Sequence, residues 1–75
     1  MNATYKDGRL SIDAGNKMNL EEIGEFVHFI LLFVNPKNVD IRQNVEDGNR
    51  TTISLDLDRD QAVTLKDKMQ FNCEI

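Results

Sequence analysis

The sequence has one cysteine, one proline and no tryptophan among its 75 residues. The lone Cys73 cannot form an internal disulfide, so we expect no covalent cross-link and a reducing, cytoplasmic setting. A chain of this length lies near the lower limit at which a hydrophobic core alone stabilises a fold. The expected organisation is therefore a single small domain over residues 1–75.

Long hydrophobic runs and basic clusters are also missing. The most apolar segment, residues 26–34, is too short to span a bilayer and contains His28. We expect no signal peptide, because the start MNATYKDG is polar and has no apolar core. Thirteen acidic residues outnumber nine basic ones, for a formal charge of −4. The basic residues are scattered and form no stripe of the kind that binds duplex phosphates. We expect no membrane partner, and the charge disfavours nucleic acid.

The apolar residues are concentrated in residues 20–34, LEEIGEFVHFILLFV, which we predict to be a helix. Asn19 and Glu22 have the spacing of a capping box at its start. Asn35 precedes Pro36 and is therefore pushed out of helical geometry, which ends the helix. At roughly 100° per residue, one side of this helix should face the core. That side carries Leu20, Ile23, Val27, Ile30, Leu31 and Val34.

A second apolar stripe, Phe26, Phe29 and Phe33, lies beside the first. Together the two stripes are about twice as wide as one sheet face can cover. Leaving several phenylalanines in water would cost a small domain a large part of its stability. We therefore expect Phe26, Phe29 and Phe33 to mediate self-association, most simply as a homodimer.

Alternation of apolar and polar residues predicts four strands, at residues 2–6, 9–14, 39–46 and 50–57. Asp7-Gly8 and Asp47-Gly48-Asn49 are turn signals that join them into two hairpins. The third strand should place Val39, Ile41 and Val45 inward. Gln43 interrupts that apolar side, which indicates an edge strand or a bulge.

A second helix is predicted to begin after Asp58, where Gln61 repeats the capping-box spacing. Its apolar stripe, Ala62, Leu65 and Met69, is narrow, and residues 72–75 are expected to fray. The order of elements predicts an α+β fold, ββαββα. Two hairpins would form one four-stranded, mostly antiparallel sheet with both helices on one face.

The sequence gives little support for catalysis or metal binding. Asp56, Asp58 and Asp60 have the D-x-D-x-D spacing that begins a calcium loop, but Gln61 stands where that loop needs glycine. A helix cap explains Asp58, the helix dipole explains Asp60, and the solvent face of a strand explains Asp56, so we favour this reading over a calcium loop. His28 has no catalytic or metal-binding partners nearby in the sequence. We expect no enzyme activity, no cofactor and no metal.

The predicted function is therefore binding to another protein. Five acids, Asp40, Glu46, Asp56, Asp58 and Asp60, could stand in for phosphates and occupy a basic site on a larger protein or complex. In size and charge alone, the chain is similar to phage-encoded inhibitors of host defence, such as anti-CRISPR and anti-restriction proteins. The alternative is a homodimeric accessory or regulatory protein that contacts nucleic acid weakly through Arg42, Arg50 and Lys6.

Overall fold

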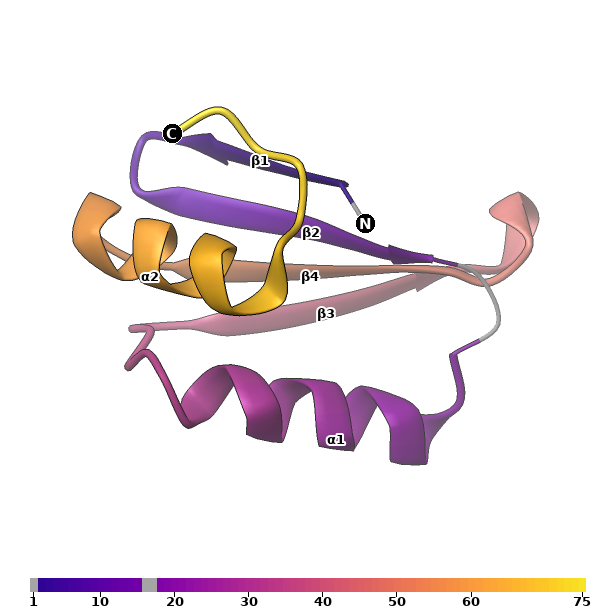
Figure 1. The fold of residues 1–75 in the computed structure, drawn as a ribbon. Helices are drawn as coiled ribbons and strands as arrows, with labels where there is room; N and C mark the ends of the chain where they lie inside the picture. The colour runs from indigo at the N-terminus through magenta and orange to yellow at the C-terminus, as the bar shows by residue number, and fades with distance from the viewer. Residues whose placement is uncertain (1, 16–17) are drawn as a thin grey trace.

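The computed structural model describes residues 2–15 and 18–75. Its order of elements confirms the predicted α+β fold (Figure 1). The strands are β1 (Asn2–Lys6), β2 (Arg9–Gly15), β3 (Val39–Asn44) and β4 (Arg50–Asp56), and the helices are α1 (Leu20–Leu31), the 3₁₀ turn η1 (Val45–Asp47) and α2 (Arg59–Met69).

The four strands form one antiparallel sheet in the order β1-β2-β4-β3. The register places Leu10 opposite Leu55 and Ile12 opposite Ile53, so four large apolar side chains meet on one face of the two central strands. Asp7 and Gly8, between β1 and β2, both have positive φ, at 53° and 79°. This is the backbone that an Asp-Gly hairpin turn requires, as predicted.

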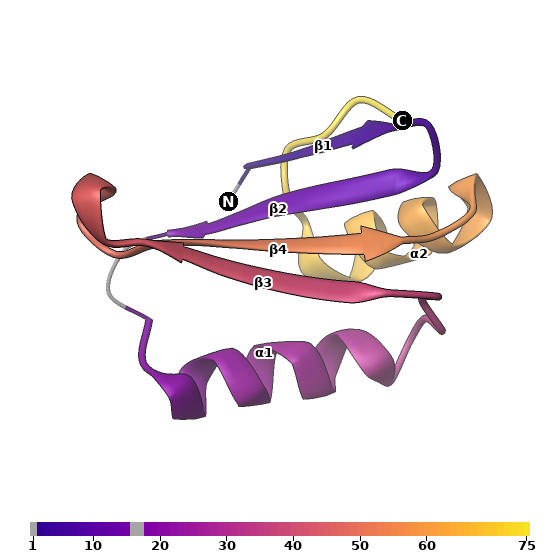
Figure 2. The same ribbon diagram turned by 180° about the vertical axis from the view of Figure 1, so that it is seen from behind.

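Both helices contribute to the core on that face of the sheet, and the opposite face carries no helix (Figures 1 and 2). The fully buried side chains include Leu10, Ile12, Ile30, Ile53, Leu55 and Leu65. Phe71, which follows α2, is also buried in this cluster. None of the helices among the described residues is long and apolar enough to cross a membrane.

The capping box at the start of α1 is present as predicted, since Asn19 accepts from the N–H of Glu22 and the Glu22 side chain accepts from Asn19. Two details of the predicted helix are wrong. It ends at Leu31, because the next N–H groups bond in a tight turn to Phe29 and Ile30. Leu20 and Leu31 are exposed, at 83% and 51%, because they lie on the flank of the helix and the sheet covers a narrower arc.

Two predictions for the remaining chain are also wrong. Val45 does not continue β3 inward but is exposed in η1, where the Asn44 side chain accepts from the N–H of Glu46 and starts a turn. The residues after α2 do not fray. Asn72 pairs with Asn2 in a parallel bridge, and the N–H of Ala3 donates to the Asn72 carbonyl at 2.9 Å.

Candidate protein-binding surface

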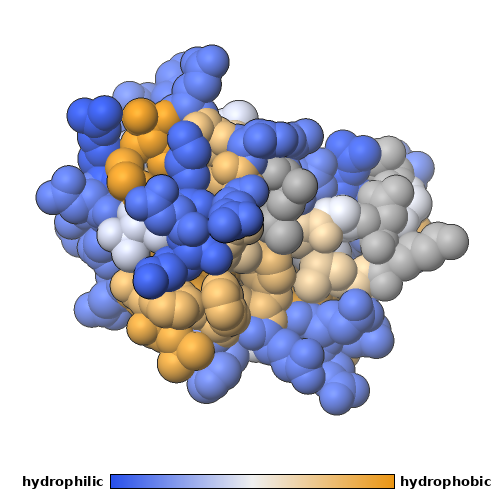
Figure 3. All heavy atoms as spheres, viewed as in Figure 1, coloured by the Kyte–Doolittle hydropathy of each residue, from blue (hydrophilic) through white to orange (hydrophobic). Residues whose placement is uncertain are grey.

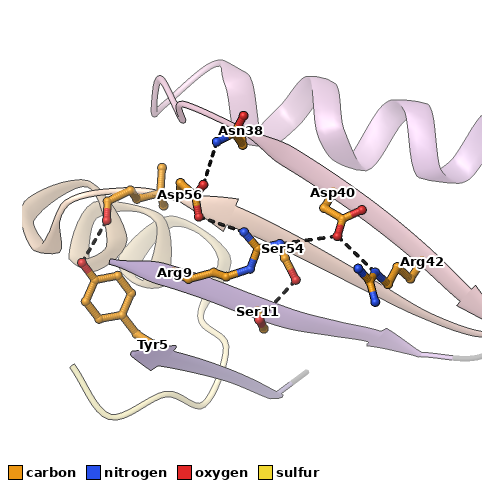
Figure 4. A network of polar contacts seen from close by, with 9 residues as sticks. Tyr5, Arg9, Ser11, Asn38, Asp40, Arg42, Ser54 and Asp56 are labelled. Carbon is orange, nitrogen blue, oxygen red and sulfur yellow. Dashed lines mark hydrogen bonds and ion pairs between the residues drawn. The ribbon is translucent and has the colours of Figure 1, made fainter. Parts of the chain in front are cut away.

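The helix-free face of the sheet carries a network of charged side chains (Figure 4). Arg9 on β2 donates to the Asp56 carboxylate at 2.9 Å and lies 3.4 Å from that of Asp40. Arg42 donates to the same Asp40 oxygen at 3.1 Å. The structure therefore brings together two of the five predicted partner-binding acids, Asp40 and Asp56, but pairs both with arginine. They do not form a bare acidic row.

Asp56 is held in its ionised form by its neighbours. The Asn38 amide donates to it at 2.8 Å, and this bond, together with the Arg9 guanidinium, lowers the pKa of the Asp56 carboxyl. Asp58 has the N-cap role proposed from the sequence, since its carboxylate accepts from the N–H of Gln61 at 2.9 Å. That bond lowers the pKa of Asp58 as well. Both acids therefore remain charged in mildly acidic solution.

The end of α1 and the start of α2 meet next to this cap. The N–H of Asn35 donates to the Gln61 side chain at 2.7 Å, and Gln61 in turn bonds to Asp58. Asp60 lies one position further on, in the first turn of α2. Glu46 is separated from Asp58 and Asp60, because η1 joins β3 to β4 at the opposite end of β4, but it lines the same hollow as Asp40. Asp58 and Asp60 thus form an acidic edge beside the end of α1.

The largest set of exposed apolar side chains lies at the same end of the molecule. We call Phe29, Leu31, Leu32 and Phe33 the α1-end patch; their exposed fractions are 41%, 51%, 63% and 38%. Figure 3 shows hydrophobic surface at this end of α1, at the lower left of the view. The rings of Phe29 and Phe33 lie edge-on with centroids 5.0 Å apart. The Lys68 ammonium of α2 lies 5.4 Å from the Phe33 ring.

The three phenylalanines predicted to mediate self-association therefore divide into two groups. Phe26 is half-buried and packs against the chain's own core, whereas Phe29 and Phe33 remain accessible. The sequence did not reveal that Leu31 and Leu32 belong with them. The only available signal was the width of the apolar arc, which shows that some residues must be exposed but not which ones. The self-association of these phenylalanines remains a prediction.

Of the residues in the alternative, nucleic-acid reading, Arg42 and Arg50 line one hollow on the helix-free face together with Arg9, whereas Lys6 lies apart from it. Arg42 pairs with Asp40, and Arg50 lies 3.4 Å from the Asp13 carboxylate. Lys6 ends β1, at the edge of the sheet away from β3. Within the described part of the helix-free face there is no aromatic side chain on which a base could stack. Tyr5 points the other way and donates its hydroxyl to the Leu57 carbonyl.

Residues 2–15 and 18–75 contain no group of three His, Cys, Asp or Glu side chains arranged to hold a metal ion. His28 is exposed on α1, and Cys73 is half-buried against the core. Comparison of the chain with protein-family models, curated proteins and solved structures gives no match.

Proposed function

We propose that this chain is a non-catalytic protein-binding module that docks through the α1-end patch and the acidic edge formed by Asp58 and Asp60. The observation that carries the proposal is the accessibility of four large apolar side chains at one end of a 75-residue chain. Exposed apolar side chains grouped at one end of a small domain and bordered by charge are typical of protein-interaction sites.

The patch has the composition of a binding hot spot. Fully burying a large apolar side chain contributes roughly 1.5–3 kcal/mol, so covering the exposed halves of four such chains would contribute several kcal/mol. The Phe29–Phe33 pair provides a semi-rigid aromatic anchor, because each ring limits the rotation of the other. A partner that offers an apolar pocket for these rings would gain most of its affinity there.

The acidic edge favours a basic partner. The cap bond from Gln61 lowers the pKa of Asp58, which favours its charged form, and Asp60 adds a second carboxylate in the same turn. Such charges steer encounter with a positively charged surface and reject acidic competitors. Proteins that handle nucleic acids carry basic surfaces of this kind. We therefore propose an inhibitory role, in which the chain occupies a basic site on a larger protein or complex in the manner of phage-encoded inhibitors of host defence.

The test is affinity purification with matched variants, followed by identification of the co-purified protein. Leu32→Ser removes an exposed apolar side chain from the α1-end patch. Val45→Ser removes one of similar exposure from η1, at the far end of the strands. A basic protein should be retained by the wild type and by Val45→Ser and lost from Leu32→Ser. If both variants retain it equally, the patch is not the binding surface.

Competition then tests the inhibitory role. Duplex DNA added to the purified complex should release the chain if both occupy the same basic site, and the release should become weaker as the chain is added in excess. The chain alone should cause no electrophoretic shift of the same DNA. A shift by the chain alone would favour the nucleic-acid alternative, and a complex unaffected by DNA would exclude occlusion.

A further inference from the structure

Among residues 2–15 and 18–75, the outer edge of β3 has no backbone partner. The opposite edge, along β1, is partly covered, because Asn72 bonds to Ala3 and Asn2. β3 pairs with β4 on one side only. No other described strand or loop donates backbone hydrogen bonds to residues 39–44. An open edge of this kind is a template for another strand.

The hydrogen-bond pattern identifies which groups point away from the sheet. The Asp56 N–H donates to the Asn38 carbonyl, so these two residues form a hydrogen-bonded pair in the β3–β4 ladder. Bonded and non-bonded pairs alternate along an antiparallel ladder. The backbone groups of Val39, Ile41 and Gln43 therefore point outward, toward the free edge.

The side chains along this edge are arranged for another strand as well. Val39 and Ile41 point to the helix-covered face, opposite the buried Leu55 and Ile53, yet remain 40% and 41% exposed. The corresponding side chains of β2 and β4, which have a strand on each side and the helices above them, are fully buried. The exposed parts of Val39 and Ile41 thus lie where a fifth strand would cover them.

We propose that β3 pairs antiparallel with β3 of a second copy, with Ile41 opposite its own equivalent on the two-fold axis. In this register the outward N–H and C=O groups of Ile41 face those of Ile41 in the second copy. Those of Val39 face those of Gln43 in the second copy, and those of Gln43 face those of Val39. Asp40 then lies opposite Arg42 of the second copy, and Arg42 opposite its Asp40. These are non-bonded pairs, in which side chains approach most closely.

Several registers place the outward backbone groups of the two β3 strands opposite each other. The charges of Asp40 and Arg42 favour the register with Ile41 opposite Ile41. Shifting the second strand by two residues in one direction places Asp40 opposite Asp40. The same shift in the other direction places Arg42 opposite Arg42. Like charges directly across a strand pair are destabilising, whereas opposite charges stabilise it. Arg42 can exchange Asp40 of its own chain for Asp40 of the second copy, because its side chain is 81% exposed and bonds to Asp40 through one nitrogen only.

Exposed side chains on one flank of α1 independently support the pairing of two copies through β3. At roughly 100° per residue, Leu20, Gly24 and Leu31 fall within roughly 40° of one another, and Phe29 lies roughly opposite Leu20. Phe29 packs on Phe33, which meets Lys68 of α2. Leu20, Gly24 and Leu31 therefore face away from α2, on the open side of α1. Strand pairing would bring this flank toward the same flank of the second copy.

This self-association is separate from the proposed binding function, because it uses the β3 edge and the α1 flank that carries Leu31, and it leaves Phe29, Leu32 and Phe33 of the α1-end patch accessible. An experiment can therefore contradict partner binding without contradicting self-association, and the reverse. Leu32→Ser should abolish partner binding and leave self-association unchanged. If Leu32→Ser instead abolishes self-association, the apolar patch is the interface between copies, and pairing through β3 is wrong.

Charge exchange at two positions tests the pairing directly. Arg42→Asp and Asp40→Arg each place like charges opposite each other in a homodimer. Each should weaken self-association by about tenfold, since two cross-strand pairs change from attraction to repulsion. An equimolar mixture of the two variants should restore it to within about threefold of the wild type, because each chain then faces the opposite charge.

Sedimentation velocity over a concentration series gives the measurement, with circular dichroism to confirm the fold of each variant. A chain carrying both changes should also dimerise, which keeps the test valid if one single variant folds poorly. Arg59→Asp, on α2, is the matched control and should behave as the wild type. A wild type that stays at 8.6 kDa at the highest soluble concentration would overturn the proposal. So would a mixture that associates no better than its components.

Discussion

A methyl group added at Gly24 should stabilise the chain, whereas the same change at Gly15 should destabilise it. A Cβ atom built at either position meets nothing within 4 Å, so packing is equal in the two cases. The backbone differs, because Gly24 lies inside α1 and Gly15 has a φ of +92°. Alanine is favoured over glycine in a helix interior by roughly 0.8–1.0 kcal/mol. An L-residue at the Gly15 conformation costs roughly 1–3 kcal/mol.

Urea unfolding in dilute solution, followed by circular dichroism, measures both changes. Gly24→Ala should raise the midpoint and Gly15→Ala should lower it, with the slope unchanged. In thermal unfolding, 1 kcal/mol corresponds to a shift of about 4–8 °C for a chain of this size. At concentrations where copies associate, the gain from Gly24→Ala should shrink, because the methyl group would then enter the contact between α1 flanks. A dilute Gly24→Ala chain less stable than the wild type would refute the placement of this position on an open helix surface.

Three further changes test the core, a long-range hydrogen bond and the acids. Ile53→Ala removes a fully buried side chain and should lower the unfolding free energy by roughly 2–5 kcal/mol, measured in urea. Tyr5→Phe removes the 2.9 Å bond to the Leu57 carbonyl and should cost roughly 1–3 kcal/mol in the same assay. The folded-state pKa values of Asp56 and Asp58 are lowered from 3.8, so their stabilisation is complete above that pH and is lost as the pH falls further. The Asn variants of both should flatten this acid dependence of the urea midpoint.

Local rules were sufficient for most of the fold. The Asp7-Gly8 turn, the Asn19 capping box and the Asp58 cap each depend on residues within a few positions of one another, and all three are present. The pairing of Leu10 with Leu55 follows from period-two alternation once the strands are adjacent. The fold class could therefore be predicted from the sequence, because residues within or next to each helix and strand indicated its type.

The errors concern residues whose environment is set by distant parts of the chain. Leu20 has the correct periodicity for burial, but nothing in its neighbourhood shows that the sheet ends before covering it. Asn72 has the sequence context of a polar terminus, but in the fold the Ala3 N–H on the edge of β1 donates to its carbonyl. Val45 keeps the alternation of β3, but the Asn44 side chain starts a turn there. The candidate surface was hard to predict for the same reason, since exposure is a property of the assembled layers.

Amide hydrogen exchange along β3 is the most direct test of whether a second chain completes the open edge. The amides of Asp40 and Arg42 bond within the sheet and should be protected at every concentration. The amide of Ile41 points to the free edge and should exchange quickly in dilute solution. It should become protected as the concentration rises, together with those of Val39 and Gln43. An Ile41 amide that exchanges equally fast in dilute and concentrated samples would contradict pairing through β3.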